Sequence, residues 1–140
     1  MYNVKTYDGI TRVDVIWDDK QKQPLSTFLS DFDQTCFCEL ATAVARIKEG
    51  TLEKYGAALD QYFFEINREG IFIEYNDGFS PVEQNKYPLA DLEEAMKIYV
   101  EAFQKAYEVD LTQPDEDYEP IVEGIINPSQ VHDTREKRFS

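Results

Sequence analysis

The chain has 140 residues, with 28 Asp and Glu against 14 Lys and Arg, and a formal net charge of −14. Such an acidic surface repels nucleic acid and anionic lipid, so we expect neither nucleic acid nor a membrane as a partner, and favour a basic protein. The length fits one domain, and a hydrophobic content of 42% is enough for a core.

Residues 2–17 are predicted to form a β-hairpin that turns at Asp8-Gly9, a dipeptide typical of tight hairpin turns. The second strand alternates, so Val13, Val15 and Trp17 share one face. A polar loop follows, and residues 24–30 are expected to add a short helical turn packed on the core.

Residues 31–49 are predicted to be helical because apolar residues recur at spacings of three and four. Asp31 and Asp33 lie near the start of this segment, and Arg46 and Lys48 lie in its last turn, which suits the helix dipole. Gly50 is a natural residue to follow the end of the helix.

A second hairpin is predicted over residues 61–76. Its alternation directs Glu65 and Glu74 towards water, with Phe63 and Phe72 beside them on the same face. The residues expected on the opposite, inward face are Tyr62, Phe64, Ile66, Ile71, Ile73 and Tyr75.

The clearest helix is predicted at residues 89–107, after an expected loop over 79–86 and a short edge strand over 87–89. Acidic residues crowd the start of this helix and Lys105 lies near its end. Its apolar stripe consists of Leu89, Leu92, Ala95, Met96, Tyr99, Phe103 and Tyr107.

The composition changes after residue 107. Residues 108–123 hold seven acidic residues and no basic ones, and the last residues turn basic at Arg135, Lys137 and Arg138. We therefore expect a single α+β domain over residues 1–107, followed by an acidic and then basic C-terminal extension over 108–140 that is irregular and partly mobile.

These elements predict an α+β fold in which one antiparallel sheet of four to five strands packs against two main helices. Its core is expected to contain Val13, Val15, Leu40, Val44, Ile47, Phe64, Ile66, Ile71, Ile73, Leu92, Met96, Tyr99 and Phe103.

Membrane and secretion signals are missing from the sequence. No apolar run approaches the roughly 20 residues of a membrane helix, and Met1 to Lys5 lack the apolar region of a signal peptide. Cys36 and Cys38 are too close together for an unstrained disulfide. We therefore expect a cytoplasmic protein with reduced thiols.

Few residues offer catalytic chemistry near neutral pH. His132 is the single histidine and lies in the polar tail. Cys36 and Cys38 lack the further ligands of a zinc site, and buried cysteine commonly acts as a small hydrophobe. Carboxylate pairs are numerous, as 28 acidic residues on a small surface would make them by chance. We predict no catalytic residue, no metal site and no cofactor, and hence a protein that is not an enzyme.

Acidic residues beside aromatic rings are the candidate contacts for a basic partner. Trp17 is either a core anchor or an interface ring, rimmed by acids, that receives Arg or Lys through a cation–π contact. The full set of candidate contact residues is Trp17, Asp18, Asp19, Glu65, Glu74, Asp77, Asp115, Glu116 and Asp117.

Residues 49–107 carry a family resemblance. Glu49-Gly50 and Tyr55-Gly56 precede the hairpin from Tyr62 to Tyr75, and the segment from Pro88 to Ala95 leads to Tyr99 and Phe103. This layout resembles the small acidic bacterial immunity proteins of contact-dependent and polymorphic toxin systems. The resemblance implies that the chain binds a toxin domain, often a basic nuclease, and blocks its active site or substrate surface.

Two other functions stay open at this point. The first is a regulatory or scaffold module of a larger assembly, and the second is a small enzyme that uses carboxylates and a metal ion. An exposed apolar stripe on the last helix would also support a homodimer.

Overall fold

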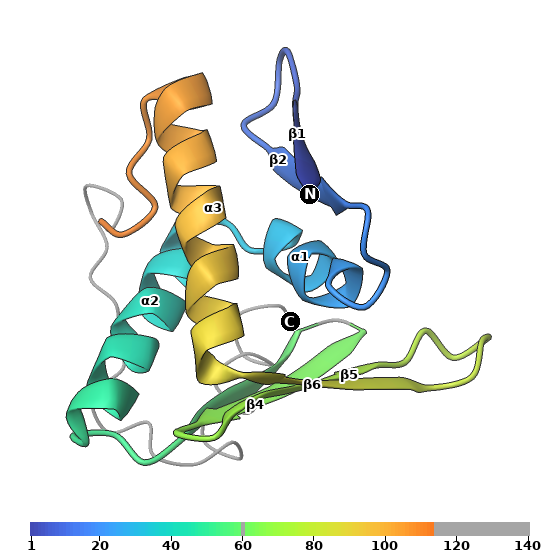
Figure 1. Cartoon of the computed structure of the whole chain (residues 1–140), viewed down its shortest axis with the longest axis vertical. Coiled ribbons are helices and arrows are strands. Elements are labelled where there is room, and N and C mark those ends of the chain that lie inside the picture. The colour runs from blue at the N-terminus through green and yellow to red at the C-terminus, as the bar shows by residue number, and fades with distance from the viewer. Residues whose placement is uncertain (60, 114–140) are drawn as a thin grey trace. The chain divides into compact units, whose positions relative to one another are not determined.

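The computed structural model describes residues 1–59 and 61–113 (Figure 1). Within them the elements follow the order β1-β2-α1-α2-β3-β4-β5-β6-α3, which confirms the predicted α+β class. The strands form two antiparallel sheets, one of two strands and one of four, where one sheet was predicted. Contacts divide the described residues into two compact units, one made of residues 1–41 and 93–113 and the other of residues 42–92.

The first unit begins with strands β1 (Tyr2–Thr6) and β2 (Val13–Trp17), which pair with each other alone. They are joined by a loop over residues 7–12, longer than the predicted turn at Asp8-Gly9. The Tyr107 hydroxyl, from helix α3 (Leu89–Tyr107), accepts the Tyr7 N–H at 2.9 Å and donates to the Arg12 carbonyl at 2.7 Å. The wider loop is thus tied at both ends by one side chain.

Helix α1 (Gln23–Ser30) is longer than the helical turn expected there. Pro24 lies in its first turn, where a missing N–H costs nothing. Leu25, Phe28 and Leu29 are buried on one side of this helix. The Tyr99 hydroxyl of α3 donates to the Ser26 carbonyl at 2.7 Å, which joins α1 to α3 within the unit.

Helix α2 (Gln34–Glu49) begins slightly later than predicted and ends directly before Gly50, as predicted. The Asp33 carboxylate accepts the Cys36 N–H at 2.7 Å and so caps the helix start. After α3, residues 108–113 belong to the folded unit: Leu111 is 2% exposed, and the Cys38 thiol lies 3.4 Å from the Thr112 carbonyl. Residues 114–140 of the predicted extension lie outside the described residues.

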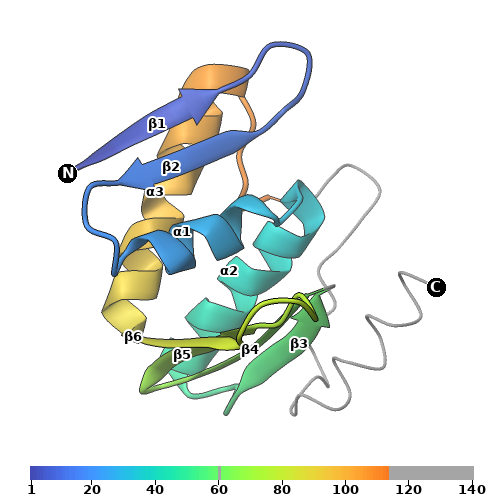
Figure 2. The same ribbon diagram turned by 90° about the vertical axis from the view of Figure 1, so that its right-hand side faces the viewer.

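The second unit holds the four-stranded sheet, formed by β3 (Tyr55–Leu59), β4 (Tyr62–Asn67), β5 (Gly70–Tyr75) and β6 (Glu83–Pro88) in sequential order (Figure 2). The β4–β5 hairpin has the predicted facing, with Phe64 opposite Ile73 and Ile66 opposite Ile71. Strand β3 was not predicted. Strand β6 occupies the second half of the segment expected to be a loop and also Tyr87 and Pro88 of the expected edge strand.

The predicted core is confirmed residue by residue, because every member of the predicted set is at most 9% exposed. The structure adds Phe28, Phe37, Tyr55 and Leu111 to the buried apolar side chains. In the part of the chain that the structure describes, no helix is both long enough and apolar enough to cross a bilayer.

Candidate binding surfaces

The outward side of the four-stranded sheet carries the candidate contacts Glu65 and Glu74. Strand pairing places Phe63 opposite Glu74 and Glu65 opposite Phe72, so aromatic and acidic side chains alternate in both directions across β4 and β5. All four side chains are half-buried. We call these four residues, Phe63, Glu65, Phe72 and Glu74, the aromatic–acidic face.

Polar neighbours hold the two carboxylates of this face. The Gln84 side-chain amide donates to Glu74 at 3.0 Å, and the Lys54 ammonium lies 3.8 Å from Glu65. Lys86 on β6 stands opposite Phe72. The cations therefore lie on the flanking strand β6 and ahead of β3, while the central strands β4 and β5 present acids and rings.

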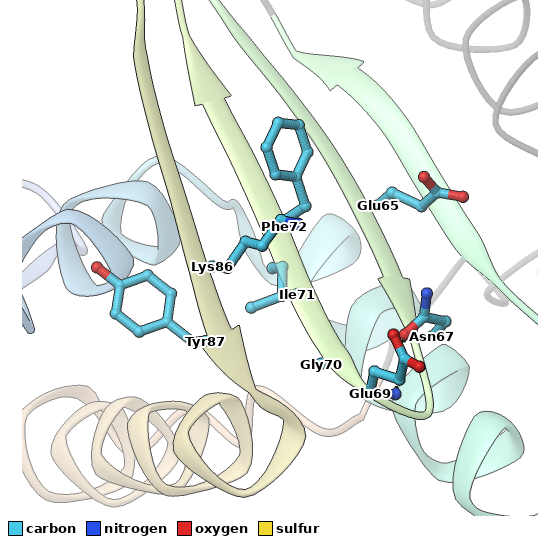
Figure 3. Close-up of a pocket in the computed structure, with 8 residues that line it drawn as sticks. All are labelled: Glu65, Asn67, Glu69, Gly70, Ile71, Phe72, Lys86 and Tyr87. Carbon is cyan, nitrogen blue, oxygen red and sulfur yellow. Dashed lines mark hydrogen bonds between the residues drawn. The ribbon is translucent and has the colours of Figure 1, made fainter.

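A hollow of about 330 Å³ opens at the hairpin end of this sheet (Figure 3). Asn67 and Gly70 line it at the end of the sheet, and Phe72 and Lys86 stand in the next row. The Asn67 side chain accepts the Glu69 N–H at 2.8 Å, which shapes the rim. A carboxylate beside an accessible ring suits a guanidinium or ammonium group.

Asp77 lies in the loop that joins β5 to β6. Its carboxylate accepts the N–H groups of Ser80 at 2.7 Å and Phe79 at 2.8 Å, and these bonds lower the pKa of Asp77 below its usual value. Its role is thus to shape the turn. The shaped turn presents Phe79, whose side chain is 97% exposed. Sequence reasoning missed Phe79 because no local pattern distinguishes an exposed loop Phe from a buried one.

Trp17 belongs to the first unit and is engaged by its own chain. Its indole N–H donates to the Ser26 hydroxyl at 2.7 Å, and its ring lies 4.9 Å from the Tyr2 ring. The Lys22 ammonium sits 4.6 Å from the centre of the Trp17 ring. Trp17 is half-buried, and a cation of its own chain already occupies the position over its indole, which stands against an interface ring that receives a partner's Arg or Lys.

Asp18 and Asp19 lead from β2 into α1, and both are exposed. The Asp18 N–H bonds to the Met1 carbonyl at 3.0 Å, and the Asp19 carboxylate accepts the Gln21 N–H at 2.9 Å. The candidate contacts Trp17, Asp18 and Asp19 therefore lie in the first unit. Glu65, Glu74 and Asp77 lie in the second unit, with Glu65 and Glu74 on the same face of the sheet. Asp115, Glu116 and Asp117 lie outside the described residues.

Cys36 and Cys38 are reduced thiols outside any disulfide, and both are buried. Within residues 1–59 and 61–113, no group of three His, Cys, Asp or Glu side chains is placed to hold a metal ion. His132 lies outside these ranges.

No family model, curated protein or solved structure matches the chain.

Proposed function

We propose that this protein is a non-enzymatic acidic binding protein that captures a basic protein through its aromatic–acidic face. The observation that carries the proposal is the alternation of half-buried Phe63 and Phe72 with Glu65 and Glu74 on one side of β4 and β5. A partner can cover these half-buried rings with little loss of side-chain conformational entropy, because their surroundings in the sheet already restrict them.

An arginine-rich surface is the complement of this face. A guanidinium can stack on a phenyl ring while it donates to a neighbouring carboxylate. On this face a ring and a carboxylate stand opposite each other on adjacent strands. The net charge of −14 adds long-range attraction, which raises the association rate more than the affinity. We infer that binding is fast and salt-sensitive.

The partner class follows from the resemblance to immunity proteins over residues 49–107, which include the aromatic–acidic face. We propose that the partner is a toxin domain with a basic, nucleic-acid-binding surface, and that the protein neutralises it by covering that surface. A genomic neighbour encoding a large toxin directly upstream would support this assignment.

The test is capture from the lysate of the source cell by wild type and two variants of equal net charge. Glu65→Gln with Glu74→Gln removes both carboxylates of the face. Glu94→Gln with Glu101→Gln removes two exposed carboxylates from α3. We expect the first variant to weaken capture of a basic protein by about tenfold, close to 1.4 kcal/mol, and the second to retain most of it.

Salt provides the second arm of this experiment. Capture by wild type should fall at about 0.5 M salt, where the screening length shortens to a few ångströms. Equal losses in the two variants would contradict the aromatic–acidic face as the site, and a partner that is not basic would contradict the proposed chemistry.

A further inference from the structure

Strand β1 has an open edge. The Asp18 N–H donates to the Met1 carbonyl, so Met1 and Asp18 form a hydrogen-bonded pair. Because hydrogen-bonded and non-hydrogen-bonded pairs alternate along an antiparallel ladder, Asn3 and Lys5 direct their backbone groups towards β2. Tyr2, Val4 and Thr6 then direct their N–H and C=O groups away from β2. Among the described residues, nothing hydrogen-bonds to these outward groups.

The opposite edge of the same hairpin is closed by side chains. The Gln23 amide accepts the Trp17 N–H at 2.7 Å and donates to the Val15 carbonyl at 3.1 Å, as a neighbouring strand would. Two backbone groups at this edge of the two-stranded sheet are therefore bonded within the chain, whereas the outward groups of β1 are free to pair.

Apolar side chains continue to the free edge. Tyr2 and Val4 share the face of Val13 and Val15, yet they are 42% and 43% exposed while the two valines on β2 are buried. A further strand beside β1 would cover Tyr2 and Val4 and extend the existing apolar layer.

The charge of β1 restricts what can pair with it. In a chain with 28 acidic residues, Tyr2–Thr6 carries Lys5 and no carboxylate. Lys5 repels a basic partner locally, whereas a second copy of this acidic chain meets no carboxylate in this strand. Lys5 also selects the register, because pairing centred on Lys5 would set two ammonium groups opposite each other.

We propose that a second copy of this chain pairs with β1 in antiparallel fashion about a two-fold axis at Val4, to form a four-stranded sheet across the dimer. In this register Val4 faces the second copy's Val4, Tyr2 faces Thr6, and Lys5 faces Asn3. All three outward-facing residues of each β1 take part in the ladder, and no like charges face each other.

This inference is independent of the proposed function, because β1 belongs to the first unit and the aromatic–acidic face to the second. The two also respond oppositely to salt. Two copies with a net charge of −14 repel, so self-association should strengthen as salt screens that repulsion, whereas capture of a basic partner should weaken.

Sedimentation equilibrium of the full chain tests the dimer with a charge swap at Val4. Val4→Lys and Val4→Glu each place like charges at the two-fold axis, and we expect each variant alone to self-associate at least tenfold more weakly than wild type. An equimolar mixture of the two should recover association, because Lys then faces Glu. Val4→Thr keeps a β-branched side chain and should dimerise nearly as well as wild type.

Circular dichroism of each variant checks that the chain is folded, and Val4 suits substitution because it is exposed. A wild-type chain that stays monomeric at low and high salt would overturn the proposal. So would Val4→Lys that associates as tightly as wild type, or a mixture no tighter than its components.

Discussion

At the scale of single residues, Lys86 is the side chain that works against the proposed binding. It stands opposite Phe72, next to the ring on which a partner's arginine would stack. An ammonium at this position repels a cationic partner, although its exposure lets solvent reduce the effect. The same position explains why the hollow above Gly70 has mixed charge.

Lys86→Gln should therefore strengthen binding of the basic partner. We expect the affinity to rise about threefold, since removing one exposed like charge is worth a fraction of 1 kcal/mol. Calorimetric titration of the captured partner measures the change. Lys97→Gln, at an exposed position on α3, makes the same change in net charge and serves as the control. Equal gains in the two variants would attribute the effect to net charge alone.

At the scale of the elements, Gly70 is the first residue of β5 and lies where β5 packs closely against β6. A β-carbon at this position would lie 1.9 Å from the Tyr87 carbonyl oxygen, and the residue has φ +145, a conformation that L side chains rarely adopt. Gly78, in the loop beyond β5, also has a positive φ of +82, but a β-carbon there meets nothing within 4 Å. Substitution at Gly70 therefore tests the steric conflict with β6, and substitution at Gly78 tests the backbone preference alone.

Gly70→Ala should lower the free energy of unfolding by more than about 2 kcal/mol, because the β5–β6 ladder must move to admit the methyl group. Gly78→Ala should cost about 1 kcal/mol, the backbone preference alone. Urea denaturation measures both values. A smaller loss for Gly70→Ala than for Gly78→Ala would show that the close approach to Tyr87 is wrong.

The elements also show how far the sequence alone can predict this fold. Strict alternation in β4 and β5 correctly directed Glu65 and Glu74 outward, and the spacing of apolar residues located α2 and α3. Only the end of strand β6, at Tyr87 and Pro88, was predicted, because residues 83–86 have no apolar alternation and are held by pairing with β5. Strand β3 was missed because small residues such as Gly56 and Ala58 carry little strand signal.

The candidate site was predictable only in part, for a similar reason. The aromatic–acidic face depends on period-two alternation within one hairpin, which the sequence displays directly. The hollow above Gly70 depends on β6 passing beside β5, a contact between segments more than ten residues apart. Trp17 could not be assigned from sequence, because its engagement by Lys22 and Ser26 arises from the path of the chain into α1.

At the scale of the whole molecule, acidic residues are distributed over both compact units and the segment over residues 108–123. Net charge alone therefore does not select a binding surface, although it attracts a basic partner from a distance. Selection requires the local combination of accessible rings and carboxylates, and this combination is what the proposal assigns to β4 and β5.

The most direct measurement is photo-crosslinking from inside that face. Phe72→benzoylphenylalanine keeps an aromatic ring at the site, and Ile10→benzoylphenylalanine places the same group on the 57%-exposed Ile10 of the first unit as the control. After irradiation in the lysate of the source cell, we predict a covalent adduct with one basic protein from position 72 and none from position 10. No adduct from position 72, or the same adduct from both positions, would contradict the aromatic–acidic face as the binding surface.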